Sequence, residues 1–559
     1  MEFRRRYLPS LAQLRQLQQR WHRVLVLSAL TGFATGVLVA GFEWITSQVL
    51  LAHVEELPHV ALALAPAFGL VGATVALQYL GPHASPSTSD EYLHVYHDRH
   101  LRMNLREFPA KVLASIATLG SGGAMGFEGP SIYIGAATGS FLQRRFSRFF
   151  SRDDSKLLLV AGASAGVAAI FKAPATGALF GIEVPFQEDT AAHAILPALV
   201  SSAASYLAFV ALHGTAPLFA ISGQPRFDAV DLLGAVGMGL LCGLGARAFV
   251  WLLRVAKDWS ATAPVALRLV VGGGGLAATA AVGFLLYDGL PVTIGPGYRA
   301  IAWSLGDRAF HLVLLLFVLH AIATACTIAG GGAGGTFIPL VVQGWLLGMV
   351  VTSAVGSSTS LFAVIGASAF LGAGYRTPIT GVVFVAESTG RPGFVVPALV
   401  ATAISQLMMG RSSITPYQRS RRPSLLQRRF DLPVTAALVP DPDVCGPGMT
   451  LDELVDHHFL RARAKTIPVV DDDGAYMGMV RLDDVVAVPR DERATTKAGD
   501  VMRDDAPIAH AEWDLRQAMR VMEEADVDRL AVLDGGRLVG VVTTSEIVRL
   551  DEILGETEE

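Results

Sequence analysis

Residues 119–139, LGSGGAMGFEGPSIYIGAATG, place one carboxylate, Glu128, among glycines inside a long apolar region. An ionisable side chain in such surroundings is costly unless it is paired, hydrated or protonated, so it marks a functional site. The glycines allow backbone N–H groups to approach a ligand closely, and Pro130 suits the first turn of a helix. The stretch therefore predicts a helix N-terminus inside a membrane, directed at a negatively charged group.

The composition indicates a multi-pass membrane protein with a polar tail. The chain has 559 residues, of which 52% are hydrophobic and 17% charged, and its mean hydropathy is +0.46. This is too apolar for one soluble domain. The net charge of −5 argues against a nucleic-acid partner, and three scattered cysteines do not suffice for a disulfide framework or a metal cluster. The predicted parts are an N-terminal segment (1–23), a membrane domain (24–418), a linker (419–432) and a tail (433–559).

Arginine clusters predict that both ends of the membrane domain face the cytoplasm. Six arginines precede the first apolar span, which begins near Val24, and six follow the last span, near residues 393–410. Lys and Arg beside membrane spans stay on the cytoplasmic side. The first span is long enough to cross a bilayer, so we expect it to be a membrane helix and not a cleaved signal.

The membrane domain contains an internal repeat. The pattern GGAxGxxxPxxxxGxxxG of residues 122–139 recurs at 331–348, shifted by 209 residues, and PxTGxxFxxE of residues 174–183 recurs at 378–387, shifted by 204. Glycine-broken segments at corresponding places in two halves point to a transporter site between the halves. Close helix packing, which also selects small residues, is the alternative explanation. The predicted halves are 24–215 and 230–418.

The two copies share their backbone pattern but differ in chemistry, because Glu128 corresponds to Phe337. Two helix N-termini that present N–H groups make a site for a dehydrated anion. Glu128 would compete for this site as a tethered anion, and protonation or a rise in free anion would release it. The sequence thus predicts an anion site that Glu128 can occupy and leave.

These motifs resemble the CLC family of chloride channels and chloride/proton antiporters. The family signature GREGP reads GFEGP at 126–130, the signature GxFxP reads GTFIP at 335–339, and the likeness covers most of residues 24–418. The resemblance implies a homodimer in the cell membrane with one anion pathway per subunit, built from inverted repeats of tilted, broken helices. It makes Glu128 the gate and implies chloride contacts from Gly129, Thr336, Phe337 and Ile338.

Two departures from the family pattern lie close to this site. The segment GSGIP corresponds to Pro86–Asp90, where Ser87 would supply the hydroxyl, with Ser85 or Thr88 as alternatives. The same cluster fits an ordinary helix N-cap. Phe127 replaces an arginine beside the gate, which removes a charge that would favour an ionised Glu128, so the pH dependence is expected to differ.

A third departure concerns protons. Antiporters of the family commonly carry a relay glutamate at the position of Val184, and valine cannot carry a proton. Glu183 and its repeat mate Glu387 are expected to be structural, tied to backbone N–H groups or an arginine, so water or Glu188 would have to supply protons. Channel-like or weakly coupled chloride transport is predicted. The alternatives are a coupled chloride/proton antiporter with an atypical proton route and a membrane-anchored nucleotide-sensing receptor; no motif predicts an enzyme.

In the family, the hydroxyl of a tyrosine near the end of the last membrane helix contacts the anion. Register favours Thr415 for this role, whereas side-chain identity favours Tyr417. Tyrosine is also common at membrane surfaces without any such role.

The tail resembles a tandem pair of CBS domains, so the fold class is a helical membrane domain followed by an α/β cytoplasmic pair. Strands near 467–471 and 478–480 precede a helix, and the pattern recurs at 530–534 and 540–542. Such pairs often bind adenosine nucleotides through GxxTxxD. Each copy here lacks one residue of that motif, so a structural or dimerising tail is the alternative. The candidate nucleotide contacts are Asp484, Thr543 and Glu546.

Overall fold

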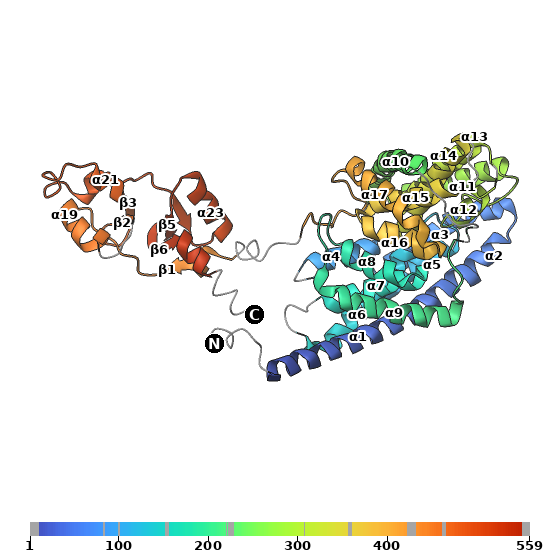
Figure 1. Cartoon of the computed structure of the whole chain (residues 1–559), viewed down its shortest axis with the longest axis horizontal. Coiled ribbons are helices and arrows are strands. Elements are labelled where there is room, and N and C mark those ends of the chain that lie inside the picture. Colours follow the sequence, from blue (N-terminus) through green and yellow to red (C-terminus); the bar gives the residue numbers. More distant parts are fainter. Residues whose placement is uncertain are drawn as a thin grey trace. The chain divides into compact units, whose positions relative to one another are not determined.

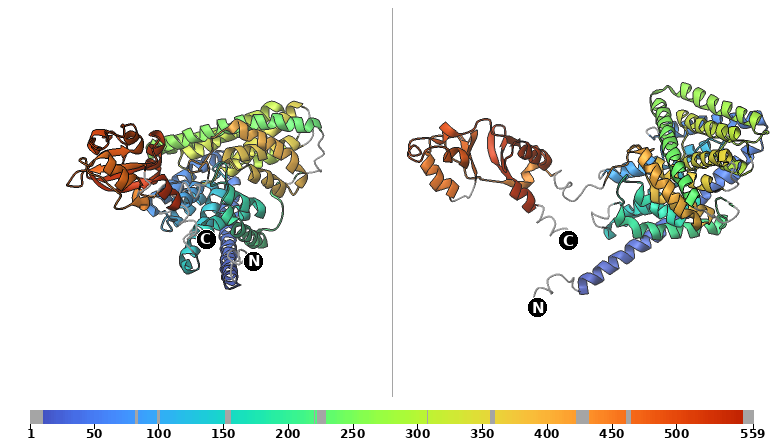
Figure 2. Two further views of the ribbon diagram at one scale, coloured as in Figure 1. Left: turned by 60° about the vertical axis from the view of Figure 1, so that its left-hand side comes forward. Right: turned by 45° about the horizontal axis from the view of Figure 1, so that its top comes forward.

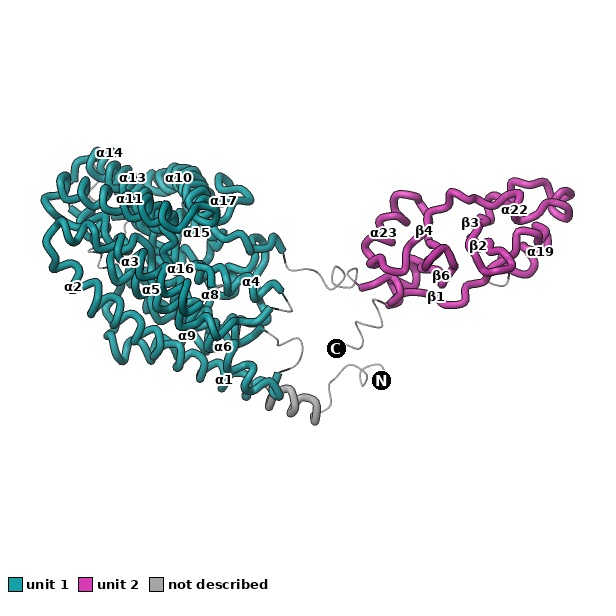
Figure 3. The backbone as a smooth tube through the Cα atoms, turned by 180° about the vertical axis from the view of Figure 1, so that it is seen from behind, with its two compact units in different colours: residues 1–422 teal, residues 423–559 magenta. Residues whose placement is uncertain are grey.

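The computed structural model divides the chain into two compact units, residues 1–422 and 423–559 (Figure 3). It describes residues 11–81, 84–98, 101–150, 156–219, 221, 229–306, 308–355, 360–421, 432–460 and 465–550, with side chains from Trp21 onward.

The first unit is helical. Its first half contains α1 (Leu11–Glu43), the π-helical η1 (Trp44–Leu51), α2 (Ala52–Glu55), α3 (His59–Leu80), α4 (Ser89–His97), α5 (Phe108–Gly120), α6 (Glu128–Arg145), α7 (Leu157–Phe171), α8 (Pro174–Glu183) and α9 (Ile195–His213). Its second half contains α10 (Ala229–Thr262), α11 (Val265–Leu286), α12 (Tyr298–Ser304), α13 (Phe310–Ala329), α14 (Phe337–Val355), α15 (Leu361–Tyr375), α16 (Pro378–Thr389) and α17 (Val395–Met409).

Long apolar helices alternate with broken ones. Within the described ranges, eight helices are long and apolar enough to cross a membrane, whereas α5, α7 and α15 are apolar but shorter. The helix α7 reverses into α8 through Lys172 at φ 52°, and α15 reverses into α16 through Arg376 at φ 59°. Irregular backbone at membrane depth must be buried in protein or line a cavity. The expected pairs of half-helices are therefore confirmed.

The two halves of the first unit form two groups of helices. Figure 1 shows α6–α9 in one group and α14–α17 in the other, with α8 and α16 adjacent at the boundary. Both views in Figure 2 keep the teal and the yellow helices in separate groups.

Some glycines of the repeat serve helix packing. A Cβ at Gly135 of α6 would lie 2.0 Å from the carbonyl of Gly162 in α7, and a Cβ at Gly344 of α14 would lie 2.2 Å from the carbonyl of Gly366 in α15. Only glycine allows helices to cross this closely. Close packing therefore explains part of the repeat, and the glycines at the helix N-termini have a different role.

The second unit is an α/β structure. One sheet has the order β1-β6-β5-β4 and the other pairs β2 with β3. Their strands are β1 (Leu438–Val439), β2 (Thr466–Val470), β3 (Tyr476–Arg481), β4 (Ile508–His510), β5 (Arg529–Asp534) and β6 (Arg537–Thr543). The named helices are α19 (Leu451–Leu454), α21 (Leu482–Val486), α22 (Ala498–Val501) and α23 (Leu515–Glu524). The expected strand-turn-strand-helix pattern is present in both copies.

The structure describes both ends of the predicted linker, 419–432. Gln187 and Glu188 donate backbone hydrogen bonds to the carbonyls of Arg419 (2.8 Å) and Ser420 (3.0 Å). Leu515 donates one to the carbonyl of Leu432 (2.8 Å). Residues at both ends of the predicted linker, 419–432, therefore belong to the two units, and residues 422–431 lie outside the described part of the chain.

Candidate anion site

The N-termini of α6 and α14 meet in the middle of the first unit. Gly126 and Gly335 exchange two backbone hydrogen bonds, each 2.8 Å long, as an antiparallel bridge. The preceding loops are fixed in the same reciprocal way: Ala124 N–H donates to Thr327 Oγ1 and Ala333 N–H to Thr118 Oγ1, each at 3.1 Å. Reciprocal contacts between repeat-related residues show a local twofold relation, which brings both helix N-termini to one point.

Glu128 lies at this point and is fully buried. Its Oε1 accepts a hydrogen bond from the backbone N–H of Phe337 at 2.6 Å, and the N–H of Ile338 also faces the carboxylate. Oε2 is buried and has no hydrogen-bond partner among the described residues. The side chain therefore occupies the N-terminus of α14, where N–H groups and the helix dipole favour an anion.

Glycines make room for the carboxylate. A Cβ at Gly126 would lie 1.8 Å from Glu128 Oε2, and a Cβ at Gly335 would lie 2.0 Å from Oε1. A Cβ at Gly129 would lie 2.6 Å from Thr88 Oγ1. Glycine at these three positions is thus a steric requirement of the site.

Aromatic rings surround the amide that binds Glu128. The Phe337 ring is fully buried and lies 4.5 Å from Phe171 and 4.9 Å from Phe384, between ring centroids. Phe127, at the position of the family arginine, is buried and packs edge to face on Phe42 at 6.4 Å. Apolar walls exclude water, which strengthens the remaining polar contacts.

Thr88 and not Ser87 is the hydroxyl residue that lies against the helix junction. Thr88 is buried and its Oγ1 donates to the carbonyl of Gly334 at 3.3 Å. The Ser87 hydroxyl instead donates to Asp90 Oδ2 at 2.9 Å. Ser85 is exposed. Of the three hydroxyl residues that the sequence left open, the geometry therefore favours Thr88, which was an alternative to Ser87.

A cavity of about 480 Å³ reaches this junction. Its lining includes Gly334 and Thr336, on either side of Gly335, together with Ser87 and Tyr375. Lys111 in the wall bonds to Glu91 and to the carbonyl of Ser87. Five basic side chains and three acidic ones line the cavity: Arg102, Lys111, Arg254, Lys257 and Arg268, and Asp90, Glu91 and Glu107. The excess of positive charge favours the entry of anions.

The tyrosine hydroxyl at the inner end of the cavity is that of Tyr375. It lies 2.9 Å from Thr336 Oγ1, and the side chain is buried. Tyr417 also lines the cavity, but it is 41% exposed and stacks on His94 at 4.5 Å. Thr415 is buried, and its hydroxyl has no hydrogen-bond partner among the described residues. The sequence prediction overlooked Tyr375, whose repeat mate at the offset of 204 is Phe171.

Glu183 and Glu387 form a reciprocal clamp between α8 and α16. Glu183 accepts hydrogen bonds from Ile379 N–H (3.1 Å), Thr380 N–H (2.9 Å) and Thr380 Oγ1 (2.6 Å). Glu387 accepts the equivalent bonds from Ala175 N–H (3.0 Å), Thr176 N–H (2.7 Å) and Thr176 Oγ1 (2.6 Å). Both carboxylates cap a helix of the other half, so their predicted structural role is confirmed.

The relay position is apolar in three dimensions as well as in sequence. Val184 is 2% exposed and belongs to the hydrophobic core. Glu188 forms an ion pair with Arg421 at 2.9 Å, and both side chains are solvent-accessible. Neither residue places a free carboxylate inside the unit.

In the tail, the three candidate nucleotide contacts have local partners. Asp484 binds Arg503 in a bidentate pair, at 3.0 Å and 2.6 Å. Thr543 Oγ1 accepts the N–H of Glu546 at 3.2 Å, as a helix cap does. Glu546 lies 3.5 Å from Arg549. Thr543 and Glu546 are thus in contact with each other, whereas Asp484 is bound to Arg503.

The family model described as voltage gated chloride channel matches residues 68–410, and the CBS domain model matches 434–491 and 498–552. The chain is 26% identical over 429 residues to the H(+)/Cl(-) exchange transporter ClcA of Salmonella paratyphi A, covering 71% of this chain and 89% of the relative. It is 27% identical over 403 residues to the putative chloride channel protein ClcB-like of Ralstonia nicotianae, covering 68% and 91%.

Solved structures show the same fold. A CLC-type fluoride/proton antiporter superposes with a TM-score of 0.61 at 24% identity, covering 74% of this chain and all of that chain. A eukaryotic CLC transporter superposes with a TM-score of 0.58 at 18% identity, covering 94% of this chain and 98% of that chain. The chain therefore belongs to the CLC voltage-gated chloride channel family of membrane anion-transport proteins and carries two C-terminal CBS domains.

Proposed function

We propose that the chain moves chloride across a cell membrane through one pathway per subunit, gated by Glu128, with channel-like or weakly proton-coupled transport. The observation that carries the proposal is the 2.6 Å hydrogen bond from Phe337 N–H to Glu128 Oε1. A carboxylate at this position stands where a free anion would bind.

Chloride and the Glu128 carboxylate compete for the same donors. When Glu128 is protonated, its attraction to the N-terminus of α14 falls, because the dipole and amides favour negative charge. The side chain can then leave, and chloride takes the N–H groups of Phe337 and Ile338. Hydroxyls of Thr336 and Tyr375, which are 2.9 Å apart, lie on the cavity side of these amides and complete the path.

Weak proton coupling is proposed because no carboxylate near the relay position is free to carry protons. Strict exchange needs a group that carries protons between Glu128 and the solvent on the side of the cavity. Val184 cannot do so, and Glu183 is held by three hydrogen bonds to α16. Protons would have to move through water to reach Glu128, which makes their stoichiometry with chloride loose.

The topology and the assembly belong to the same proposal. The arginine clusters place residues 1–23 and the CBS tail in the cytoplasm. We take the active form to be a homodimer, as the family resemblance implies. The tail acts as a regulatory or dimerising element in the proposal, and the partners of Asp484, Thr543 and Glu546 do not favour an adenosine nucleotide there.

A coupled chloride/proton antiporter is the second candidate. It is favoured by the names of relatives such as the H(+)/Cl(-) exchange transporter ClcA. In this case an atypical route would deliver protons to Glu128. A membrane-anchored receptor is disfavoured, because an anchor needs neither a buried carboxylate on a helix N-terminus nor a charged cavity leading to it.

Ion efflux from liposomes separates these functions. Purified protein is reconstituted into chloride-loaded vesicles, and a chloride electrode and a pH electrode record the external solution together. We expect chloride loss with little linked proton movement. A fixed ratio of protons to chloride would establish the antiporter instead, and the absence of chloride loss would refute transport.

A further inference from the structure

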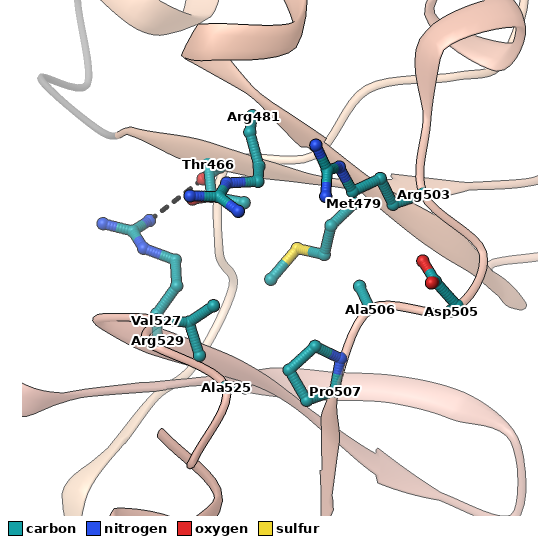
Figure 4. Close-up of a pocket in the computed structure, with 10 residues that line it drawn as sticks. All are labelled: Thr466, Met479, Arg481, Arg503, Asp505, Ala506, Pro507, Ala525, Val527 and Arg529. Carbon is teal, nitrogen blue, oxygen red and sulfur yellow. Dashed lines mark hydrogen bonds between the residues drawn. The ribbon is translucent and has the colours of Figure 1, made fainter. Parts of the chain in front are cut away.

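A small cleft in the CBS tail gathers three arginines from separate segments. It has a volume of about 140 Å³ and lies beside the two sheets of this unit. Arg481 ends β3, Arg503 follows α22, and Arg529 begins β5. Figure 4 shows Arg481 and Arg503 at the upper edge of the cleft and Arg529 rising from the lower left, with Met479, Val527 and Pro507 as the apolar lining.

Two of the three arginines are held in place. Arg503 is fixed by its bidentate pair with Asp484 and by two backbone hydrogen bonds with Met479, at 3.0 Å and 2.8 Å. Arg529 Nη1 donates to the carbonyl of Thr466 at 3.1 Å, drawn as the dashed line in Figure 4. Arg529 Nε is buried and lacks a hydrogen-bond partner in the described part of the chain; Asp528 lies 3.8 Å away.

The lining of the cleft carries more positive than negative charge, and Arg481 is its unpaired arginine among the described residues. Three guanidinium groups line it, against one lining carboxylate, that of Asp505. Outside the lining, Asp484 is bound to Arg503 and Asp528 lies 3.8 Å from Arg529, so Arg481 is the arginine with no carboxylate partner among the described residues. Like charges close together in a partly buried cleft repel one another, and a bound anion would offset this repulsion. Planar guanidinium groups bind oxyanions such as phosphate with paired N–H donors.

The size and lining of the cleft restrict the ligand. Sites for drug-sized molecules occupy about 300–1,000 Å³, so a cleft of about 140 Å³ fits a small ligand better than a nucleoside. The aspartate of the nucleotide motif, Asp484, is bound to Arg503. We propose that this cleft binds a small oxyanion of the phosphate class through Arg481, Arg503 and Arg529, and that it does not bind an adenosine nucleotide.

Calorimetry on the full-length protein in detergent tests the proposal. Inorganic phosphate, AMP and adenosine are titrated separately at constant chloride and ionic strength, so that the membrane site contributes equally in every titration. We expect saturable binding of phosphate and no binding of AMP or adenosine. Saturable binding of AMP, with or without adenosine binding, would overturn the proposal in favour of a nucleotide site, and the absence of phosphate binding would overturn it outright.

Matched variants locate the ligand. R481Q removes one guanidinium that has no described partner, and we expect it to weaken phosphate binding by about tenfold, or about 1.4 kcal/mol. R549Q serves as the control, because Arg549 pairs with Glu546 and does not line the cleft. Equal phosphate affinity in R481Q and R549Q, with unchanged elution profiles, would show that phosphate binds elsewhere. R481K keeps the charge and should retain part of the affinity.

Discussion

Glu183 caps the N-terminus of α16, and Glu387, which lies 204 residues later, caps the N-terminus of α8 in the same way. Each carboxylate binds two backbone N–H groups and one threonine hydroxyl of the opposite half. The two halves of the membrane unit are thus joined by a symmetric pair of charged helix caps, close to the relay position at Val184. A carboxylate committed to such a cap is not free to carry protons.

E183Q and E387Q should therefore destabilise the protein to a similar extent. Hydrogen bonds to a charged group are worth about 1.5–3 kcal/mol each, and an amide satisfies the same donors less well. We expect both variants to lower the apparent melting temperature in detergent. E188Q is the control, because an exposed ion pair such as Glu188–Arg421 is worth about 0–1 kcal/mol. A variant E183Q that melts like E188Q would disprove the structural role.

Y375F should weaken chloride binding by about tenfold or more, because a hydrogen bond to a charged group contributes about 1.5–3 kcal/mol. The Tyr375 hydroxyl points at Thr336 at the inner end of the cavity, whereas Tyr417 is 41% exposed. Y417F is the matched control and should bind chloride like the parent. Titration calorimetry with chloride measures both. The reverse order of effects would return the role to Tyr417.

G335A should reduce chloride flux severely. Its Cβ would lie 2.0 Å from Glu128 Oε1, in the space that the carboxylate and chloride would share. G237A adds the same methyl group in α10, where a Cβ meets no heavy atom within 4 Å. Flux measured in liposomes should fall only in G335A. Normal flux in a correctly folded G335A would mean that the anion passes elsewhere.

V184E should increase proton movement per chloride. Val184 is 2% exposed at the end of α8, so a carboxylate introduced there would be buried and able to exchange a proton. V184Q is the control, since its side chain has a similar size but does not titrate. Simultaneous chloride and pH recordings should show proton coupling in V184E alone. If the parent already moves protons at a fixed ratio and V184E does not change it, the proton route lies elsewhere.

Much of the architecture could be predicted from the sequence, because its main signals are local or repeated. The offset of 209 residues predicts that Glu128 and Phe337 occupy equivalent helix starts, and the structure brings them into direct contact. The helix-capping roles of Glu183 and Glu387 follow from the same symmetry. The strands and helices of the tail follow from short alternating and amphipathic patterns.

Contacts that depend on packing between distant elements could not be predicted. Tyr375 ends α15, and its hydroxyl reaches Thr336 only because α14 and α15 cross closely at Gly344 and Gly366. The sequence left Ser85, Ser87 and Thr88 as alternatives, because the turn of the chain before α4 decides which hydroxyl faces Gly334. No pattern in the sequence predicts which side chain of such a turn faces the junction.

In the tail, too, a contact between distant segments could not be predicted from the sequence. The sequence makes Asp484 a candidate ligand contact on motif spacing alone, but in the structure its carboxylate binds Arg503, which is 19 residues further along the chain. A partner at this separation is set by the fold of the unit and not by helical or strand periodicity.

A bromide-soaked crystal structure of E128Q tests most directly whether the Glu128 carboxylate occupies an anion site. Bromide replaces chloride and is located by its anomalous scattering, with the parent protein in the same conditions as the control. The account predicts a bromide peak within hydrogen-bonding distance of the Phe337 amide in E128Q, with the introduced glutamine side chain displaced. A glutamine that stays on this amide, with no bromide near the N-terminus of α14, would contradict it.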